Sequence, residues 1–340
     1  MSGKSPPGGG CDHGDGHRPM KSRLSWILKA LITSGLLYYI FTIIPIEGIV
    51  PAIASARLEY FAVSFLLLLL KNYFASWRMK RLTDRQGLTV SLRRIFEINL
   101  ITNYYGLFLP GSLAGGPIRW HKLYQVDRNG PGIFISIMFN RFMLTTATAG
   151  TGVVFWALAG KHAASNAAGF TLLGILSGLL ALQGAFVHGK LSAWAERTVD
   201  SRVRMSEALR DKLRKLFLAL GHYRNLPLPA LLRIAAFSLA EELVGVASFF
   251  FVSLAIGLEV PFVHLGWIRS CIIFVTMLPI SFSGFGVREG MLIALLAPYG
   301  VGGTAAVAFS LLLYSRNLLL ALAGGVLETG YLFVPQNGKR

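Results

Sequence analysis

Two arginines in this chain each follow a short segment that glycine and proline interrupt. Arg119 ends the stretch 109–119 (LPGSLAGGPIR), and Arg288 ends the stretch 278–288 (LPISFSGFGVR). The two stretches match at Leu, Pro, Ser, Gly and Arg, at an offset of 169 residues in a chain of 340. Guanidinium groups and the N–H groups of a helix N-terminus both bind phosphate and other anions. We therefore interpret the stretches as duplicated anion-binding elements, with chance similarity of two glycine-rich loops as the alternative.

Each stretch also predicts a break in a helix. Proline removes a backbone donor, and glycine adopts conformations that other residues resist. Inside a membrane such a break is tolerated only against protein or a water-filled cavity. The predicted break residues are Pro110, Gly115, Gly116, Pro279, Gly284 and Gly286. Ser112 and Ser281, at matching positions, add hydroxyl groups for a polar headgroup.

The composition indicates where these breaks lie. Hydrophobic residues make up 54% of the chain and charged residues 14%, and the mean hydropathy is +0.56. A soluble domain carries about 25% charged residues. The chain is therefore predicted to be an all-α polytopic membrane protein. Its two cysteines, Cys11 and Cys271, exclude a disulfide framework.

Hydropathy predicts about six full spans and two interrupted apolar stretches. The spans are 25–44, 60–77, 132–158, 170–188, 231–257 and 305–334, and the interrupted stretches are 95–117 and 266–298. Lys and Arg in the connecting segments are split 24 to 2 between the two sides of this arrangement. The basic side is expected to be cytoplasmic, and both termini fall on it.

The same charges indicate how the interrupted stretches lie. The segments 78–94 and 118–131 are both basic, whereas 258–266 and 298–304 contain no Lys or Arg. Each stretch must then enter and leave on one side, either as a re-entrant hairpin or as two short helices. Three spans separate the two hairpins, so the second half is inverted relative to the first. Inverted-topology repeats are typical of secondary transporters.

Ionisable residues inside spans are costly and are usually paired or functional. They are Glu97, Arg141, Glu241, Glu242, Arg269, Arg316 and Glu328. We hypothesise that Arg141, Arg288 and Arg316 face a central polar cavity. Glu241 or Glu242 would supply counter-charges, as would Glu289 beside Arg288. The predicted headgroup-binding set is Arg119, Arg141, Arg288 and Arg316 with Ser112 and Ser281. Structural ion pairs, or for Arg119 a charge anchor at the membrane rim, are the alternatives.

Three further segments lie outside the spans. Residues 1–24 are polar and rich in Gly and Pro, and we expect them to be disordered. The expected divisions are a membrane domain at 25–334 with halves at about 25–158 and 170–334, a cytoplasmic loop at 189–230 and a tail at 335–340. The loop has Leu209, Leu213, Leu216 and Leu220 at helical spacing opposite basic residues. This pattern predicts an amphipathic helix on an anionic membrane surface, or a docking site for a partner.

The motifs resemble a known family. Asn99, Asn103 and the stretch 109–119, together with 278–290, look like the flippase-like family that includes the transmembrane region of bacterial lysylphosphatidylglycerol synthases. Asn140-Arg141 is similar to an arginine found in that family after the first hairpin. Pro117 stands where the family often has an aspartate, which puts any role of that aspartate in doubt for this chain.

The resemblance covers about residues 25–334 and implies movement or handling of polar lipids across the bacterial inner membrane. Some family members accompany hopanoid or glycolipid pathways. The soluble aminoacyl-transferring domain of the fused synthases has no counterpart in the short segment after the last span, so synthase activity is not expected.

Two classes of function follow. One is a lipid translocase, in which an anionic or glycosylated headgroup passes between the inverted hairpins. The other is a lipid-modifying membrane enzyme, or a non-catalytic accessory subunit or scaffold for lipid-biosynthetic enzymes. We do not expect an enzyme, because the spans contain no His-rich set and no Asp pair. Membrane lipids are the expected partners, with no cofactor, metal or nucleic acid, and the oligomeric state is left open.

Overall fold

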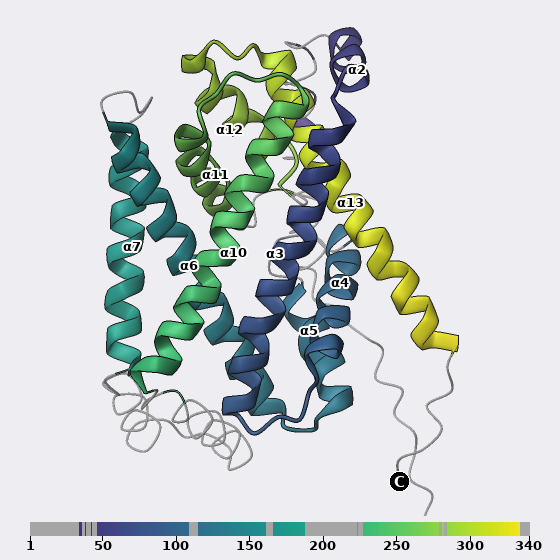
Figure 1. Ribbon diagram of the computed structural model, residues 1–340, viewed down its shortest axis with the longest axis vertical. Coiled ribbons are helices and arrows are strands. Elements are labelled where there is room, and N and C mark those ends of the chain that lie inside the picture. The colour runs from purple at the N-terminus through teal and green to yellow at the C-terminus, as the bar shows by residue number, and fades with distance from the viewer. Residues whose placement is uncertain are drawn as a thin grey trace, which may run out of the picture.

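The computed structural model describes most of the apolar part of the chain. The described residues are 34, 35, 38, 42, 46–108, 115–160, 166–187, 223, 227–278, 281 and 284–333. They form α2 (Ile46–Ala54), α3 (Leu58–Arg85), α4 (Leu92–Phe108), α5 (Gly115–Val126), α6 (Gly130–Ala159), α7 (Asn166–Val187), α10 (Leu228–Ala255), α11 (Phe262–Met277), α12 (Val287–Leu296), a short 3-10 turn η2 (Ala297–Tyr299) and α13 (Gly303–Phe333) (Figure 1). The predicted disorder at 1–24, the leucines of the amphipathic helix, the tail and most of the first span lie outside these residues.

Five of the described helices are long and apolar enough to cross a membrane: α3, α6, α7, α10 and α13. The 28 residues of α3 extend for about 42 Å at about 1.5 Å per residue, which exceeds the bilayer's apolar thickness of about 30 Å. The predicted all-α membrane fold is therefore confirmed. The predicted end of the second span at 77 is wrong, because α3 continues to Arg85. Hydropathy ends the span early because the last turns of α3 are basic.

Each motif lies between two short helices. α4 and α5 flank the first motif, and α11 and α12 flank the second. In Figure 1, α4 and α5 lie in the lower part of the bundle, whereas α11 and α12 lie in the upper part. The two pairs thus open toward opposite ends, and each consists of two short helices, which is one of the two forms predicted. We call the end with the α3–α4 and α5–α6 turns the basic end.

The turns that precede the two hairpins have the same backbone structure. Gly87 follows α3 and Gly257 follows α10, both with φ of +72° and 170 residues apart. Leu88 N–H donates to Thr83 O at 3.1 Å, and the equivalent bond 170 residues later measures 2.9 Å. Both turns are Schellman caps, which place a residue in the left-handed region and so favour glycine. A shared cap at a constant offset supports the duplication that the motifs indicate.

The two halves exchange their hairpins. α4 packs along α13, and α11 packs along α6, so each hairpin contacts the last span of the other half. Glycine allows both approaches, since a Cβ on Gly324 would lie 2.1 Å from Leu100 O, and one on Gly152 would lie 2.7 Å from Ser270 Cβ. The equivalent spans α3 and α10 pack against each other between the two hairpins. This arrangement is the inverted repeat that the charge pattern predicts.

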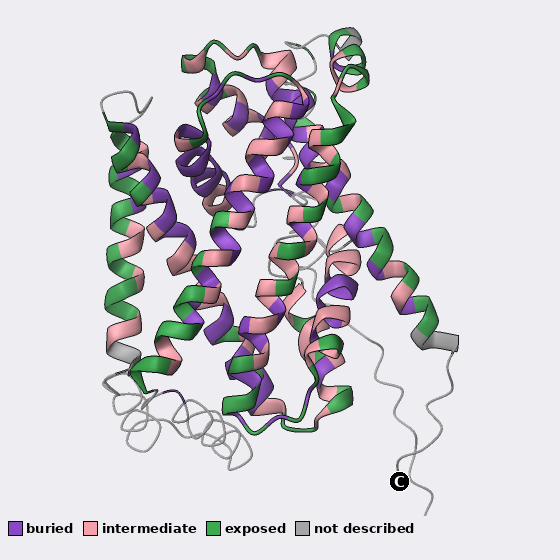
Figure 2. Ribbon diagram, viewed as in Figure 1, coloured by how far each residue is buried: buried purple, intermediate pink, exposed green. Residues whose placement is uncertain are grey.

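Burial separates the central helices from the peripheral ones. Figure 2 shows α11 buried along most of its length and α7 exposed along most of its length. A large apolar cluster joins α10, α11 and α13 around Val246, Trp267 and Phe309, which are all fully buried. The apolar side chains exposed on α3 and α7 are the surfaces that contact lipid tails in a membrane.

The crossing of α4 and α13 gives a test of the packing. Gly324→Ala places a methyl group against the α4 backbone, so we expect a loss of about 1–3 kcal/mol, the usual cost of overpacking. Gly330→Ala, on the same helix with nothing within 4 Å of its Cβ, is the matched control and should not lower stability. Thermal unfolding of both variants in detergent measures the difference. Equal melting temperatures for the two variants would contradict the close crossing.

Candidate functional site

A buried ion pair joins the two central spans. Arg78 of α3 is 1% exposed, and its Nη1 lies 2.6 Å from Glu241 Oε2 of α10. Its Nε donates to Asn140 Oδ1 at 2.8 Å, and its Nη1 donates to Ser238 Oγ at 3.3 Å. Three helices, α3, α6 and α10, therefore fix this guanidinium. Arg78 was predicted to lie in a loop, and only the extension of α3 beyond residue 77 places it in the interior.

Three more cations surround Glu241. Lys71 Nζ lies 3.7 Å from Glu241 Oε1. Arg119, at the start of α5, is within electrostatic range of Arg78, Arg141 and Glu241. We call these five residues the Glu241 cluster. Four cations share one carboxylate in this cluster, so its net charge is positive.

The predicted arginines Arg119 and Arg141 make few polar contacts. The Nε of Arg119 is buried without a hydrogen-bond partner. The guanidinium of Arg141, on α6, forms no hydrogen bond or ion pair with the residues that the structure describes. Both side chains are half-buried. These two guanidinium groups therefore have donors to spare inside the bundle.

A second buried pair lies beside the first. Arg269 Nη1 of α11 donates to Glu242 Oε2 of α10 at 2.7 Å, and both side chains are buried. Gly245 makes room for this arginine, because a Cβ there would lie 2.5 Å from Arg269 Nη2. Glu241 and Glu242 are thus counter-charges, but the predicted partners are wrong. Neither glutamate pairs with Arg141, Arg288 or Arg316, because other cations on α3 and α11 lie closer.

Arg316 of α13 binds hydroxyl and carbonyl groups in place of a carboxylate. Its Nη1 donates to Ser64 Oγ at 2.9 Å and to Ser248 O at 2.9 Å, and also to Ser248 Oγ. The side chain is buried, its Nε has no hydrogen-bond partner, and no described acidic residue forms an ion pair with it. Arg316 therefore adds a further uncompensated positive charge at the crossing of α3, α10 and α13.

Arg288, by contrast, is fully occupied. Its Nη2 donates to Glu289 Oε1 at 2.9 Å, and its Nε donates to Ser310 Oγ at 2.6 Å. Its guanidinium also lies over the rings of Phe285 and Tyr314, at 5.5 and 5.7 Å from the ring centroids. The alternative of a structural pair with Glu289 is the one that the structure adopts.

Glu289 has a second role at the start of α12. Its Oε2 accepts the N–H of Gly286 at 2.7 Å, which closes the helix N-terminus. Gly286 and Gly284 have φ of +80° and +78°, a conformation that glycine adopts without strain. The predicted break at these two glycines is therefore confirmed.

The first break is described only in part. Gly115 and Gly116 begin α5, and a Cβ on Gly115 would lie 2.8 Å from Thr102 Cγ2 of α4. Ser281, in the second motif, is buried at 4% exposure. Pro110, Ser112 and Pro279 lie outside the described residues.

One further contact of the first hairpin was not predicted. Lys122 Nζ of α5 donates to Glu328 Oε2 of α13 at 2.8 Å, and Tyr105 OH of α4 donates to Glu328 Oε1 at 3.0 Å. This contact ties both helices of the first hairpin to the last span. The depth of Glu328 in a predicted span signalled a paired charge, but its partners depend on the exchanged hairpins.

At the basic end, Tyr223 connects α3 with α6. Its hydroxyl donates to Leu82 O at 2.8 Å and lies 2.9 Å from Ser136 Oγ. Burial raises the pKa of Tyr223 to about 12, although the hydrogen bond with Ser136 favours the charged form. The hydroxyl therefore stays protonated and keeps its hydrogen bonds at neutral pH.

The pair of Arg269 and Glu242 gives a test of how the charges are held. Glu242→Gln leaves a buried guanidinium uncompensated, and we expect a loss of about 3–5 kcal/mol in stability. Arg269→Gln should cost a similar amount, and the double variant should cost less than the sum because neither charge remains. Thermal unfolding of the four proteins in detergent gives the coupling.

The exposed pair of Lys80 and Asp84 on α3 is the control for this cycle. Asp84→Asn should change stability by about 0.5 kcal/mol or less. Additive losses in the Glu242 and Arg269 cycle would mean that the two side chains do not interact.

Comparison with known proteins follows the same boundaries. No curated protein is similar enough to this chain to count as a match. Residues 26–325 match a protein-family model described as the lysylphosphatidylglycerol synthase transmembrane region. The match includes both motifs, both hairpins and every residue of the Glu241 cluster, and it confirms the resemblance seen in the motifs. The chain belongs to the family of the lysylphosphatidylglycerol synthase transmembrane region.

Proposed function

We propose that this protein binds the anionic headgroup of a membrane lipid at the Glu241 cluster and moves the lipid across the bilayer. The observation that supports the proposal most directly is the surplus of cations around one carboxylate. Lys71, Arg78, Arg119 and Arg141 face Glu241 alone. Charges within a membrane are costly, and those that persist are paired with another group or serve function. A phosphate or carboxylate of a lipid headgroup would supply the missing negative charge.

The duplication provides an internal comparison that favours the first hairpin as the binding site. In the second motif Glu289 follows Arg288 and supplies the anion that this arginine binds. In the first motif Trp120 follows Arg119, and its ring stacks on Tyr124. The first motif thus keeps the arginine and lacks the built-in carboxylate.

Two other positions differ in the same direction. Pro117 replaces Gly286, so the first motif has no N–H group there to hold a carboxylate side chain. Counted from the helix starts at 130 and 303, Arg141 of α6 corresponds to Tyr314 of α13, whose ring lies beside Arg288. A second guanidinium therefore stands near Arg119 at the position where the other half has an aromatic ring. These differences suit an anion that comes from outside the chain.

The charge distribution supports an orientation. The basic end carries the turns 86–91 and 127–129, and the positive-inside rule places such an end in the cytoplasm. The site would then receive lipid from the cytoplasmic leaflet of the bacterial inner membrane. The proposal requires no catalytic step, and the chain acts as a carrier whose two hairpins open toward opposite sides.

The proposal is tested by reconstitution. Purified protein in liposomes should accelerate the passage of fluorescent phosphatidylglycerol between leaflets more than that of phosphatidylcholine. Passage is followed by chemical quenching of the label in the outer leaflet. Unchanged passage of both lipids would overturn translocation and leave an accessory role in lipid biosynthesis as the alternative.

The cluster residues give the matching variants. Arg119→Gln and Arg141→Gln each remove a charged donor, and a charged hydrogen bond contributes about 1.5–3 kcal/mol, which corresponds to about tenfold or more in the rate of lipid passage. Arg233→Gln, on the exposed face of α10, is the matched control and should keep the wild-type rate. Wild-type rates for both cluster variants would exclude the Glu241 cluster as the headgroup site.

A further inference from the structure

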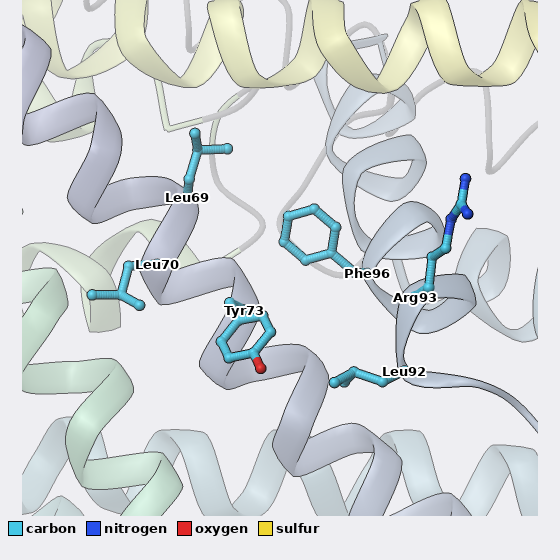
Figure 3. A pocket seen from close by; sticks show the side chains of 6 residues that line it. All are labelled: Leu69, Leu70, Tyr73, Leu92, Arg93 and Phe96. Carbon is cyan, nitrogen blue, oxygen red and sulfur yellow. The ribbon is translucent and has the colours of Figure 1, made fainter.

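An apolar groove separates parts of α3 and α4 on the surface of the bundle. It encloses about 530 Å³. Figure 3 shows its lining side chains, which are Leu69, Leu70, Tyr73, Leu92, Arg93 and Phe96. Leu70 and Tyr73 are 40% and 44% exposed, so the groove opens to the surroundings of the protein. Around a membrane span those surroundings are lipid tails.

Apolar walls alone do not select a lipid. Lipid tails are as apolar as leucine side chains, so a tail gains little by leaving the bilayer for the groove. Selection must come from a polar group at the groove, and Arg93 is the charged residue that lines it. Its side chain is 90% exposed and lies at the end of the groove near the basic end of the bundle.

The charges near this end favour an anion. Arg93 Nε lies 3.0 Å from Glu97 Oε1, and Arg94 Nη1 lies 3.5 Å from Glu97 Oε2. Two arginines therefore share one carboxylate, and the three residues carry a net positive charge. A lipid phosphate at the depth of Arg93 would balance that charge while its tail extends along Leu70 and Phe96.

We propose that the groove between α3 and α4 binds an acyl chain of an anionic phospholipid from the leaflet at the basic end, with the phosphate at Arg93. The groove is thereby a lipid site separate from the Glu241 cluster. Its volume is within the range of about 300–1,000 Å³ that ligand sites occupy.

The seam next to the groove provides a route to the interior. Uncharged hydrogen bonds join α3 to α4, with Asn103 Nδ2 at 3.3 Å from Asn72 Oδ1 and Asn99 Nδ2 at 2.7 Å from Ser76 Oγ. Such bonds between membrane helices are weak, so the seam can open. Lys71 of the Glu241 cluster directly follows Leu70 of the groove. This route from the groove to the cluster rests on the proposed function, whereas lipid binding in the groove does not.

The experiment uses a photo-crosslinking amino acid, benzoylphenylalanine, in place of Leu70. The full-length protein is reconstituted in vesicles with equal amounts of phosphatidylglycerol and phosphatidylcholine that carry identical acyl chains, and lipid adducts are quantified by mass spectrometry. The same probe in place of Leu180, which is 52% exposed on α7, reports bulk lipid. We expect phosphatidylglycerol to be enriched at position 70 over position 180 by about fivefold, the effect of one basic residue near an anionic surface.

Arg93→Gln should remove this enrichment, and Arg233→Gln should leave it unchanged. Equal adduct ratios at positions 70 and 180, or an enrichment that survives Arg93→Gln, would overturn the proposal. If the probe at position 70 prevents folding, the same measurement is made with the probe in place of Tyr73. Arg141→Gln should keep the enrichment, so the groove and the Glu241 cluster can fail independently of each other.

Discussion

The ion pair between Arg78 and Glu241 holds the centre of this protein together. Its two charges come from α3 and α10, the equivalent spans of the two halves, and neither charge has access to water. A buried charge that lost its partner would be strongly destabilising. Asn140 and Ser238 satisfy the remaining donors of Arg78, so the positions of α3, α6 and α10 all depend on this one guanidinium. The surrounding cations then compete for a carboxylate whose place is fixed.

The two halves share one plan and differ in how they compensate charge. The second hairpin neutralises its arginine with Glu289 and Ser310, so it is complete without a ligand. The first hairpin has Arg119 and Arg141 and no acid of its own. Its negative charge is Glu241, which belongs to the other half and already binds Arg78. A duplicated fold can thus keep one copy as a structural element and leave the other copy ready for a ligand.

Sequence patterns predicted the features that depend on local chemistry. Apolar runs predicted the spans, the basic loops predicted the inverted hairpins, and Gly284 and Gly286 lie in the left-handed region as a break requires. The ion pairs could not be predicted in this way, because they depend on which helices meet. Arg78 was placed in a loop because hydropathy averages its turn with the basic residues that follow. Arg288 was expected in a cavity, and only the fold brings Ser310 and Tyr314 to it.

The exchange of hairpins between the halves has a consequence for biogenesis. α4 finds its partner α13 only after nearly the whole chain has been synthesised. Until then the polar face of α4, including Asn99 and Thr102, has no place against the helix that later covers it. The first hairpin must therefore wait beside the insertion machinery or in contact with α3 and α5, and the halves cannot mature one after the other. A chain cut between α6 and α7 would yield two fragments that assemble only when both are made in the same membrane.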